Sequence, residues 1–185
     1  MTDWMDSEIK ELYEEHGEKT LEKSECPFKR ILVSIINQQI STEAGAAIQE
    51  RFFDRFELTP ESILEADEDR MSDVGLSSQK SDYMKSAAEH FIEDDLTAER
   101  FGEMSDEEVI EEMTEIRGIG DWTAKMFLMF ALGREDVFPV EDLGIRRAMA
   151  GVYGIESRKE MREKAEEWRP KRSIASLYLW EFRND

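Results

Sequence analysis

The sequence predicts an all-α protein built of two helical lobes, and three observations support this prediction. Apolar residues recur at the three- and four-residue spacing of a helix face, whereas the two-residue alternation typical of strands is almost absent. Capping residues precede many of these runs and glycines end several of them. The connections between runs are short, which favours direct helix-on-helix packing. We expect one core over residues 1–185, with a central lobe at roughly 40–140 and a second lobe formed by both ends of the chain, facing it across a cleft.

Residues at the ends of the first helices define them. "DSEIKELYEEHG" begins after a capping Asp6 and ends at Gly17, and "PFKRILVSIINQQI" begins at Pro27, because proline suits the first helical turn. The runs that follow are "STEAGAAIQERFFDRF" (capped by Ser41 or Thr42), a short helix after Thr59-Pro60, and "SSQKSDYMKSAAEHFIEDD" (capped by Ser77 or Ser78).

The second half of the chain continues the helical pattern, to a total of roughly ten helices. "SDEEVIEEMTEI" carries acidic residues in its first turn, where the helix dipole favours them. The later runs are "DWTAKMFL", "VEDLGIRRAMAGVYG" (ended by Gly154), "SRKEMREKAEEW" and "RPKRSIASLYLWEF", with Pro170 near its start.

The charge balance allows two opposite interpretations. Forty-four acidic residues face twenty-four basic ones, giving a net charge of −20. Such a chain should repel nucleic acid, because affinity for phosphates normally comes from Lys and Arg. Alternatively, the acidic surface is typical of a protein from a halophilic host, since the Debye length is only about 3 Å in 1 M salt. Composition alone leaves both open.

Several classes of site and location are disfavoured. Cys26 is the only cysteine, which excludes an internal disulfide and a cysteine-held metal centre. His16 and His90 lie in unrelated helical patterns and are expected on the solvated surface, so we predict no metal site made of side chains. No run approaches the roughly 18 apolar residues of a membrane span, and the charged start lacks the apolar core of a signal peptide. A cytoplasmic protein without membrane association is the default expectation.

The stretch "RGIGDWTAKMFL", residues 117–128, places two glycines directly before a helix. A tight connection between packed helices is the simpler interpretation of Gly118-Ile119-Gly120. The alternative is an anion site, because bare backbone lets a ligand approach and the helix start offers free N–H groups. The spacing from Ile116 through Ile119 to Thr123 is that of a helix-hairpin-helix, with Ile119 buried, and it would bind a phosphate without a lysine.

The stretch "EIRGIGDWTAKMFLMFALGREDVFPVEDLGIRRAM" resembles the helix-hairpin-helix, the Gly/Pro-rich loop and the aspartate of the DNA glycosylase superfamily. It is most similar to the alkylpurine branch, the 3-methyladenine DNA glycosylase II family. The resemblance extends to "SIINQQISTEAGAAIQERF", "VGLSSQKSDYMKSAA" and "WRPKRSIASLYLW", and so covers roughly residues 27–182. It implies a minimal catalytic core with a DNA-binding cleft between its lobes.

Asp142 is the residue that the resemblance aligns with the family's catalytic aspartate. Its role would be to stabilise the cationic sugar as the base leaves, and to orient the attacking water. Asp142 also directly precedes the helical run "LGIRRAM", where aspartate is a favoured N-cap, and the two roles are compatible. We expect the neighbouring Glu141 to point to solvent.

The resemblance also implies the type of reaction and the base pocket. Strand-nicking members carry a lysine two residues after the second hairpin glycine, where this chain has Trp122, so a hydrolytic glycosylase without lyase activity is expected, and Lys125 lies a turn further on. Trp122 and Trp180 match aromatic positions that would hold a flipped, cationic base, although each alone would suit a core. The remaining predicted pocket residues are Met126 and Leu143, where the family often has aromatics, and Phe28.

Two further sets of residues are predicted to contact DNA. Gln39 is expected to fill the gap left by the flipped base, with Gln38 and Ile40 as alternatives, although polar residues commonly end a helix. Two basic pairs stand out in so acidic a chain and are candidates for phosphate contacts, although ordinary salt bridges explain them equally well: Arg146, Arg147, Lys171 and Arg172.

The sequence therefore predicts a monomeric, monofunctional glycosylase that removes alkylated purines, of the 3-methyladenine and 7-methylguanine type, from double-stranded DNA. No organic cofactor is implied; the resemblance allows a monovalent cation at the hairpin backbone. The alternatives are excision of hypoxanthine or uracil, and a non-catalytic DNA-binding module that kept only the hairpin.

Overall fold

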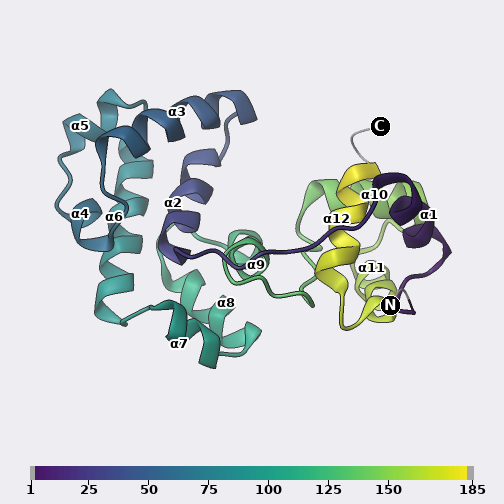
Figure 1. Ribbon diagram of the computed structural model, residues 1–185. Coiled ribbons are helices and arrows are strands. Elements are labelled where there is room, and N and C mark those ends of the chain that lie inside the picture. Colours follow the sequence, from purple (N-terminus) through teal and green to yellow (C-terminus); the bar gives the residue numbers. More distant parts are fainter. Residues whose placement is uncertain (1–2, 183–185) are drawn as a thin grey trace. The chain divides into compact units, whose positions relative to one another are not determined.

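The computed structural model describes residues 3–182, and within that range it contains helices but no strands. The helices are α1 (Ser7–His16), α2 (Pro27–Asn37), α3 (Thr42–Arg55), α4 (Pro60–Leu64), α5 (Glu68–Asp73), α6 (Ser78–Glu93), α7 (Ala98–Glu103), α8 (Asp106–Glu115), α9 (Asp121–Phe130), α10 (Leu143–Tyr153), α11 (Arg158–Ala165), the short 3-10 helix η1 (Glu166–Trp168) and α12 (Arg172–Phe182) (Figure 1). The all-α prediction is confirmed.

The predicted caps explain where the helices begin. The side chains of Asp6, Ser41, Thr59 and Ser77 each accept a hydrogen bond from a backbone N–H of the first turn that follows. Ser105 and Glu108 form a reciprocal capping box at α8. Two short, highly charged helices, α5 and α7, have no apolar run of their own and were not delimited from the sequence.

The chain divides into two compact units. The central unit comprises residues 24–127, and the terminal unit comprises residues 1–23 and 128–185. The sequence placed the central lobe at roughly 40–140. The observed boundary lies earlier at both ends because α2 packs against α3 and α6, while the segment after residue 127 belongs with the C-terminal helices.

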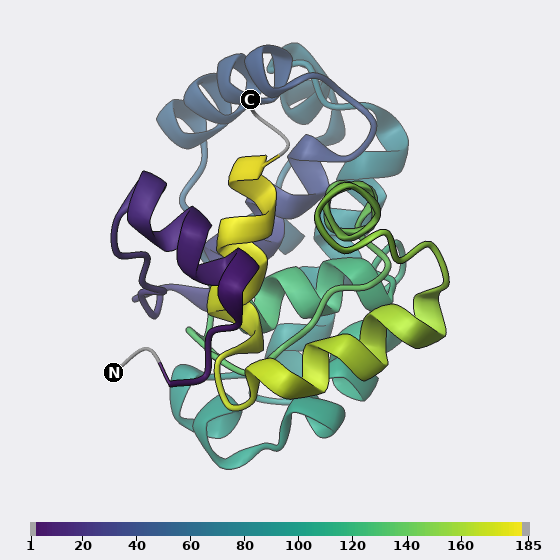
Figure 2. The same ribbon diagram turned by 90° about the vertical axis from the view of Figure 1, so that its right-hand side faces the viewer.

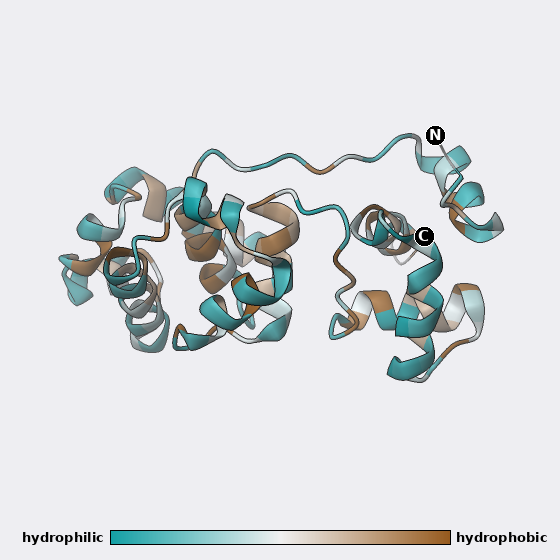
Figure 3. Cartoon of the chain, turned by 90° about the horizontal axis from the view of Figure 1, so that it is seen from below, coloured by the Kyte–Doolittle hydropathy of each residue, from teal (hydrophilic) through white to brown (hydrophobic). Residues whose placement is uncertain are grey.

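In the central unit, α6 is the helix around which the others gather: α2, α4 and α5 all pack against it (Figure 1). The apolar face of α2 is fully buried. A row of phenylalanine rings extends through the unit, with centroids 5.1 Å apart for Phe28 and Phe91, 5.8 Å for Phe91 and Phe101, and 5.1 Å for Phe101 and Phe127. Hydrophobic stretches lie on the helix sides that face neighbouring helices (Figure 3).

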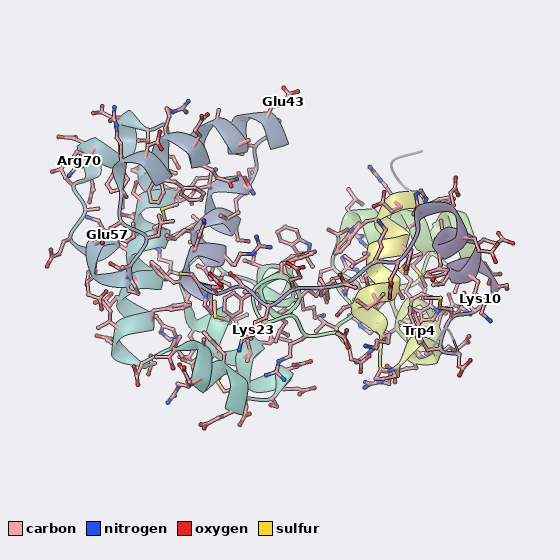
Figure 4. The ribbon with its side chains drawn as sticks, viewed as in Figure 1. Trp4, Lys10, Lys23, Glu43, Glu57 and Arg70 are labelled. Carbon is pink, nitrogen blue, oxygen red and sulfur yellow. The ribbon has the colours of Figure 1, made fainter. Side chains whose placement is uncertain are left out.

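In the terminal unit, the first and last helices of the chain lie side by side, and α12 also packs against α10 (Figure 2). The hydroxyl of Tyr178 in α12 donates to the carbonyl of Gly17 and accepts from the backbone N–H of Lys19, both at 3.1 Å. Trp4 packs against the core of this unit (Figure 4). The contacts between α1 and α12 tie the two separated stretches of sequence into one unit.

Asp6 is the polar centre of the terminal unit. Its carboxylate accepts hydrogen bonds from the backbone N–H of Ile9 at 2.9 Å, the indole N–H of Trp168 at 2.8 Å and the hydroxyl of Tyr153 at 3.0 Å. The ammonium of Lys164 lies 2.9 Å away. Burial raises the pKa of this carboxyl, but the four partners outweigh burial and hold its pKa below the ordinary value.

The prediction that both histidines lie on the solvated surface is wrong. The side chain of His16 is 18% exposed and that of His90 is 15% exposed. His90 lies between two carboxylates, with Nδ1 3.4 Å from Asp94 and Nε2 2.8 Å from Glu112. It therefore joins α6 to α8, because both of its ring nitrogens face acidic side chains. In the described residues no helix is long and apolar enough to cross a membrane.

Candidate functional site

The functional residues predicted from the sequence fall into two groups, one in each unit. The central unit contains the hairpin, the predicted wedge and Trp122. The terminal unit contains Asp142 and Trp180.

The hairpin of the central unit joins α8 to α9 through a turn at residues 117–120. The backbone N–H of Ile119 donates to the carbonyl of Ile116 at 3.0 Å, and the Ile119 side chain is buried as predicted. The N–H of Ala124 donates to the carbonyl of Gly120 at 3.0 Å. The N–H groups of the intervening first turn of α9 have no preceding helical carbonyl, which is the arrangement that binds anions at helix starts.

The two hairpin glycines have different surroundings. Gly118 has φ +90, and a Cβ atom there would lie 2.3 Å from the ring of Tyr83, so both conformation and packing exclude a side chain. A Cβ atom on Gly120 would meet no atom within 4 Å. Gly120 therefore leaves open space where a ligand could approach the backbone.

A surface cavity of about 630 Å³ lies beside the hairpin, within the central unit. It contains Gly118 and Trp122, whose side chain is 41% exposed, together with both glutamines predicted as the wedge. Its other polar lining residues were not predicted as part of a site: Asn37 ends α2, and the rest, which include Gln79, Lys80 and Tyr83, lie at the start of α6. The only signal of this second group in the sequence was the run "SSQKSDY" at a helix start.

In the terminal unit, Asp142 is the N-cap of α10, and one of its oxygens is held from two sides. Oδ1 accepts from the backbone N–H of Ile145 at 2.9 Å and from the indole Nε1–H of Trp180 at 2.9 Å. Trp180 was predicted only as a wall for the base, so its hydrogen bond to Asp142 is new information from the structure. The carboxylate is half-buried and lies at the N-terminal, positive end of α10.

Gly144 allows Trp180 to reach Asp142. A Cβ atom on Gly144 would lie 2.9 Å from Asp142 Oδ1 and 3.1 Å from the indole ring. Phe130 covers Trp180 from the side, with ring centroids 5.9 Å apart and an interplanar angle of 30°. Sequence reasoning missed both residues, because a helical glycine and one more aromatic give no distinctive signal.

The loop before Asp142 is fixed by the start of α12. The buried hydroxyl of Ser173 donates to the carbonyl of Arg134 at 2.7 Å and accepts from the N–H of Val137 at 2.8 Å. The backbone N–H of Asp142 donates to the carbonyl of Pro139 at 2.9 Å. These bonds set the direction from which the chain enters α10.

Several predicted site residues have other partners. Phe28 is 4% exposed and its ring packs at 59° against that of Phe91, so the structure places it in the core rather than in a base pocket. Lys171 pairs with Glu135, and Arg172 with Asp136 at 2.8 Å, which makes both of them braces of the Asp142 loop rather than free phosphate contacts. The Thr123 side chain is buried, so only its backbone could serve a ligand.

Four other predicted site residues are exposed or half-buried, so a ligand could reach them. Leu143 is 51% exposed directly after Asp142, Arg147 is exposed, and Met126 is half-buried. Arg146 is half-buried with a buried Nε that has no hydrogen-bond partner. Glu141 does not point freely to solvent as expected, because its carboxylate is 22% exposed and lies 3.7 Å from Arg162.

Comparison with known proteins places this geometry in context. The model of a family described as "HhH-GPD superfamily base excision DNA repair protein" matches residues 32–171, a span that contains the hairpin and Asp142 but not Trp180. The chain is 36% identical over 174 residues to DNA-3-methyladenine glycosylase 1 of Schizosaccharomyces pombe, covering 88% of this chain and 74% of that protein. It is 30% identical to a Bacillus subtilis relative, of which it spans 63%.

Solved structures give the same picture. The S. pombe 3-methyladenine DNA glycosylase bound to abasic DNA superposes with a TM-score of 0.86 at 32% identity, over 98% of this chain and 93% of that one. A DNA-3-methyladenine glycosidase from Bacillus halodurans gives a TM-score of 0.86 at 31% identity, over 98% and 88% of the two chains.

Proposed function

Because the chain belongs to the HhH-GPD superfamily of base excision DNA repair proteins, we propose that it is a monofunctional DNA glycosylase for alkylated purines in double-stranded DNA. One observation carries the proposal: Asp142 stands at the start of α10, in the family-matched span, with Oδ1 fixed by Trp180 and Ile145. Its relatives include proteins of Schizosaccharomyces pombe and Saccharomyces cerevisiae that are named DNA-3-methyladenine glycosylases. A carboxylate so held suits the stabilisation of a positive charge.

The proposed reaction breaks the N-glycosidic bond of a flipped nucleotide. The bonding electrons leave with the base, and a positive charge develops on the sugar. Asp142 stabilises that charge, and its fixed orientation means that no reorganisation is needed as the charge appears. Water then attacks the sugar carbon and loses a proton. A cationic alkylated purine leaves as a neutral base, so the reaction needs no acid to protonate it.

Trp122 and Trp180 supply the contacts for the base in this proposal. Indole faces attract cations, at roughly 0.5–2 kcal/mol according to the degree of desolvation. Trp122 stands at the position where strand-nicking members of the family carry a lysine. Without that amine, water is the nucleophile. Leu143 and Met126 stand at positions where the family often has aromatics, so the predicted set of pocket residues is less aromatic than the family's usual one.

In this proposal the hairpin binds DNA even though the protein carries a net charge of −20. Backbone N–H groups at the start of α9 bind a phosphate without any basic side chain. Arg147 and Arg146 are the remaining candidates for phosphate contacts. Glu43 and Glu57 project outward from the central unit, as part of an acidic surface that we attribute to a high-salt environment (Figure 4).

The proposal includes a monovalent cation held by carbonyl oxygens of the hairpin. Carbonyl oxygens are the kind of ligand that suits Na⁺ or K⁺. No step of the proposed reaction depends on the ion. We also propose that the protein acts as a monomer in the cytoplasm. Neither point affects the role of Asp142.

The test is to incubate methylated duplex DNA with the protein and to identify the released bases by chromatography. Release of 3-methyladenine and 7-methylguanine is expected, with the DNA strand left intact until alkali is added. Borohydride added during the reaction should trap no covalent protein–DNA adduct. Binding without release would favour a non-catalytic module, and release of hypoxanthine or uracil alone would favour a different lesion.

A further inference from the structure

The loop between α2 and α3, residues 38–41, contains a residue with an unusual backbone conformation. Gln39 has φ +58, and Asp95 is the only other non-glycine residue with a positive φ in the part of the chain that the structure describes. A glutamine in this region persists only where its surroundings hold it. The Gln39 side chain is exposed at the cavity beside the hairpin.

Three side chains brace this loop. The ammonium of Lys80 donates to the carbonyl of Ile36 at 2.7 Å, which satisfies a carbonyl in the last turn of α2. The amide of Gln49 donates to Asn37 Oδ1 at 2.9 Å. These two bonds fix the end of α2, directly before the loop, to α6 and α3.

The third brace is Gln38, and it reaches the hairpin itself. Its Nε2 donates to the carbonyl of Gly118 at 3.0 Å across 80 residues of sequence. Gly118 in turn lies close against the ring of Tyr83, since a Cβ atom added to it would be 2.3 Å from that ring. The residue next to the exposed Gln39 is therefore bonded to the backbone that is proposed to hold a DNA phosphate.

We propose that Gln38 is a positioning residue that couples the hairpin to Gln39. When the DNA backbone binds to the hairpin, this coupling fixes the Gln39 side chain, which fills the gap left in the base stack by the flipped base. The inference rests on the proposed function. Gln38 acts through the donor end of its amide, because the partner is a carbonyl and a carboxylate in its place would face that carbonyl with no donor.

The first experiment compares Gln38→Met and Gln38→Glu, which remove the donor at similar size, with the matched control Gln49→Met. The control removes one amide bond from the same loop and leaves the link to the hairpin intact. We expect single-turnover excision by both Gln38 variants to fall about tenfold, as for the loss of one hydrogen bond to a positioned group. Thermal midpoints of both variants, and the affinity of the uncharged Gln38→Met for undamaged duplex, should stay near wild-type values, and Gln49→Met should excise within twofold of wild type.

The second experiment asks whether Gln38 works through Gln39. In the Gln39→Ala background there is no wedge to position, so Gln38→Met should cost little further activity, and the two effects should be strongly non-additive. The Gln38→Met defect should also shrink on a lesion placed in a mismatch, because such a base costs less to extrude. A purely structural role for Gln38 would give the same defect on both substrates.

The inference is overturned if Gln38→Met excises at the wild-type rate, if its loss simply adds to that of Gln39→Ala, or if affinity for undamaged DNA falls in parallel with the rate. The last result would make Gln38 a direct DNA contact. Failure of the proposed function is a separate outcome, because the wild-type protein would then release no base.

Discussion

Asp142→Asn separates the charge of the side chain from its role as a helix cap. Asparagine keeps a side-chain oxygen that can accept from both the Ile145 N–H and the Trp180 indole, the two donors that hold Oδ1 at 2.9 Å. Asparagine is also as good an N-cap as aspartate. The negative charge that we propose to stabilise the sugar cation is lost.

The magnitudes of the two effects differ enough to be measured separately. Losing one preorganised electrostatic contact typically lowers the rate by about 10²–10³, roughly 3–4 kcal/mol. Hydrogen bonds to a charged group contribute about 1 kcal/mol more than neutral ones, so we expect unfolding to become about 1–2 kcal/mol easier. For a chain of this size that corresponds to a fall in Tm of a few degrees, roughly 2–4 °C per kcal/mol.

Asp6 provides a matched control in the same unit. It also caps a helix and also accepts an indole N–H, from Trp168, but its carboxylate is further engaged by Lys164 and Tyr153. Asp6→Asn should therefore lower the Tm more than Asp142→Asn does, because it breaks an ion pair that is largely buried. The fraction that remains folded should excise at the wild-type rate.

Three measurements on each variant show whether Asp142 acts in the chemistry or only as a helix cap: single-turnover excision, a thermal melt and a DNA titration. We expect Asp142→Asn to be folded, to bind damaged duplex at least as tightly as wild type, and to be nearly inactive. Excision within a few-fold of wild type would reduce Asp142 to a cap. An equal loss of rate in folded Asp6→Asn would show that the assay reports damage to the terminal unit rather than chemistry.

Three further outcomes are expected. Trp122→Ala should reduce excision of 7-methylguanine more than that of neutral hypoxanthine, by up to about 2 kcal/mol, and equal losses on the two bases would limit Trp122 to shape. Stability followed by circular dichroism should rise from low salt to about 1 M as repulsion among the acidic residues is screened, whereas a chain equally stable without salt would refute adaptation to salt. The pKa of Asp6 is lower in the folded state than its ordinary value of 3.8, so its contribution to stability is present above that value and is lost as the pH falls through the lowered pKa. The difference in Tm between wild type and Asp6→Asn should accordingly be largest near neutral pH and narrow in acid, and a constant difference would contradict this assignment.

The sequence by itself determined the features that depend on neighbours along the chain. Capping side chains such as Asp6 and Ser77 bond to N–H groups only a few residues away, so they mark helix starts wherever the rest of the chain lies. The hairpin was readable for the same reason, because its glycines and the start of α9 form one continuous stretch. The role of Asp142 as a cap followed from its place directly before an apolar helical run.

Tertiary structure decided what each side chain meets from distant parts of the sequence. Phe28 and Trp122 are both aromatic residues on helices, yet Phe28 is buried in the core and Trp122 lines a cavity, because burial depends on which helices cover that face. The basic pair at Lys171 and Arg172 braces a loop because Glu135 and Asp136 lie beside it. Gln38 meets Gly118 across 80 residues, and Trp180 meets Asp142 across 38. A hydrogen bond needs its donor and acceptor within about 3 Å, and at such separations only the packing of helices can bring them there.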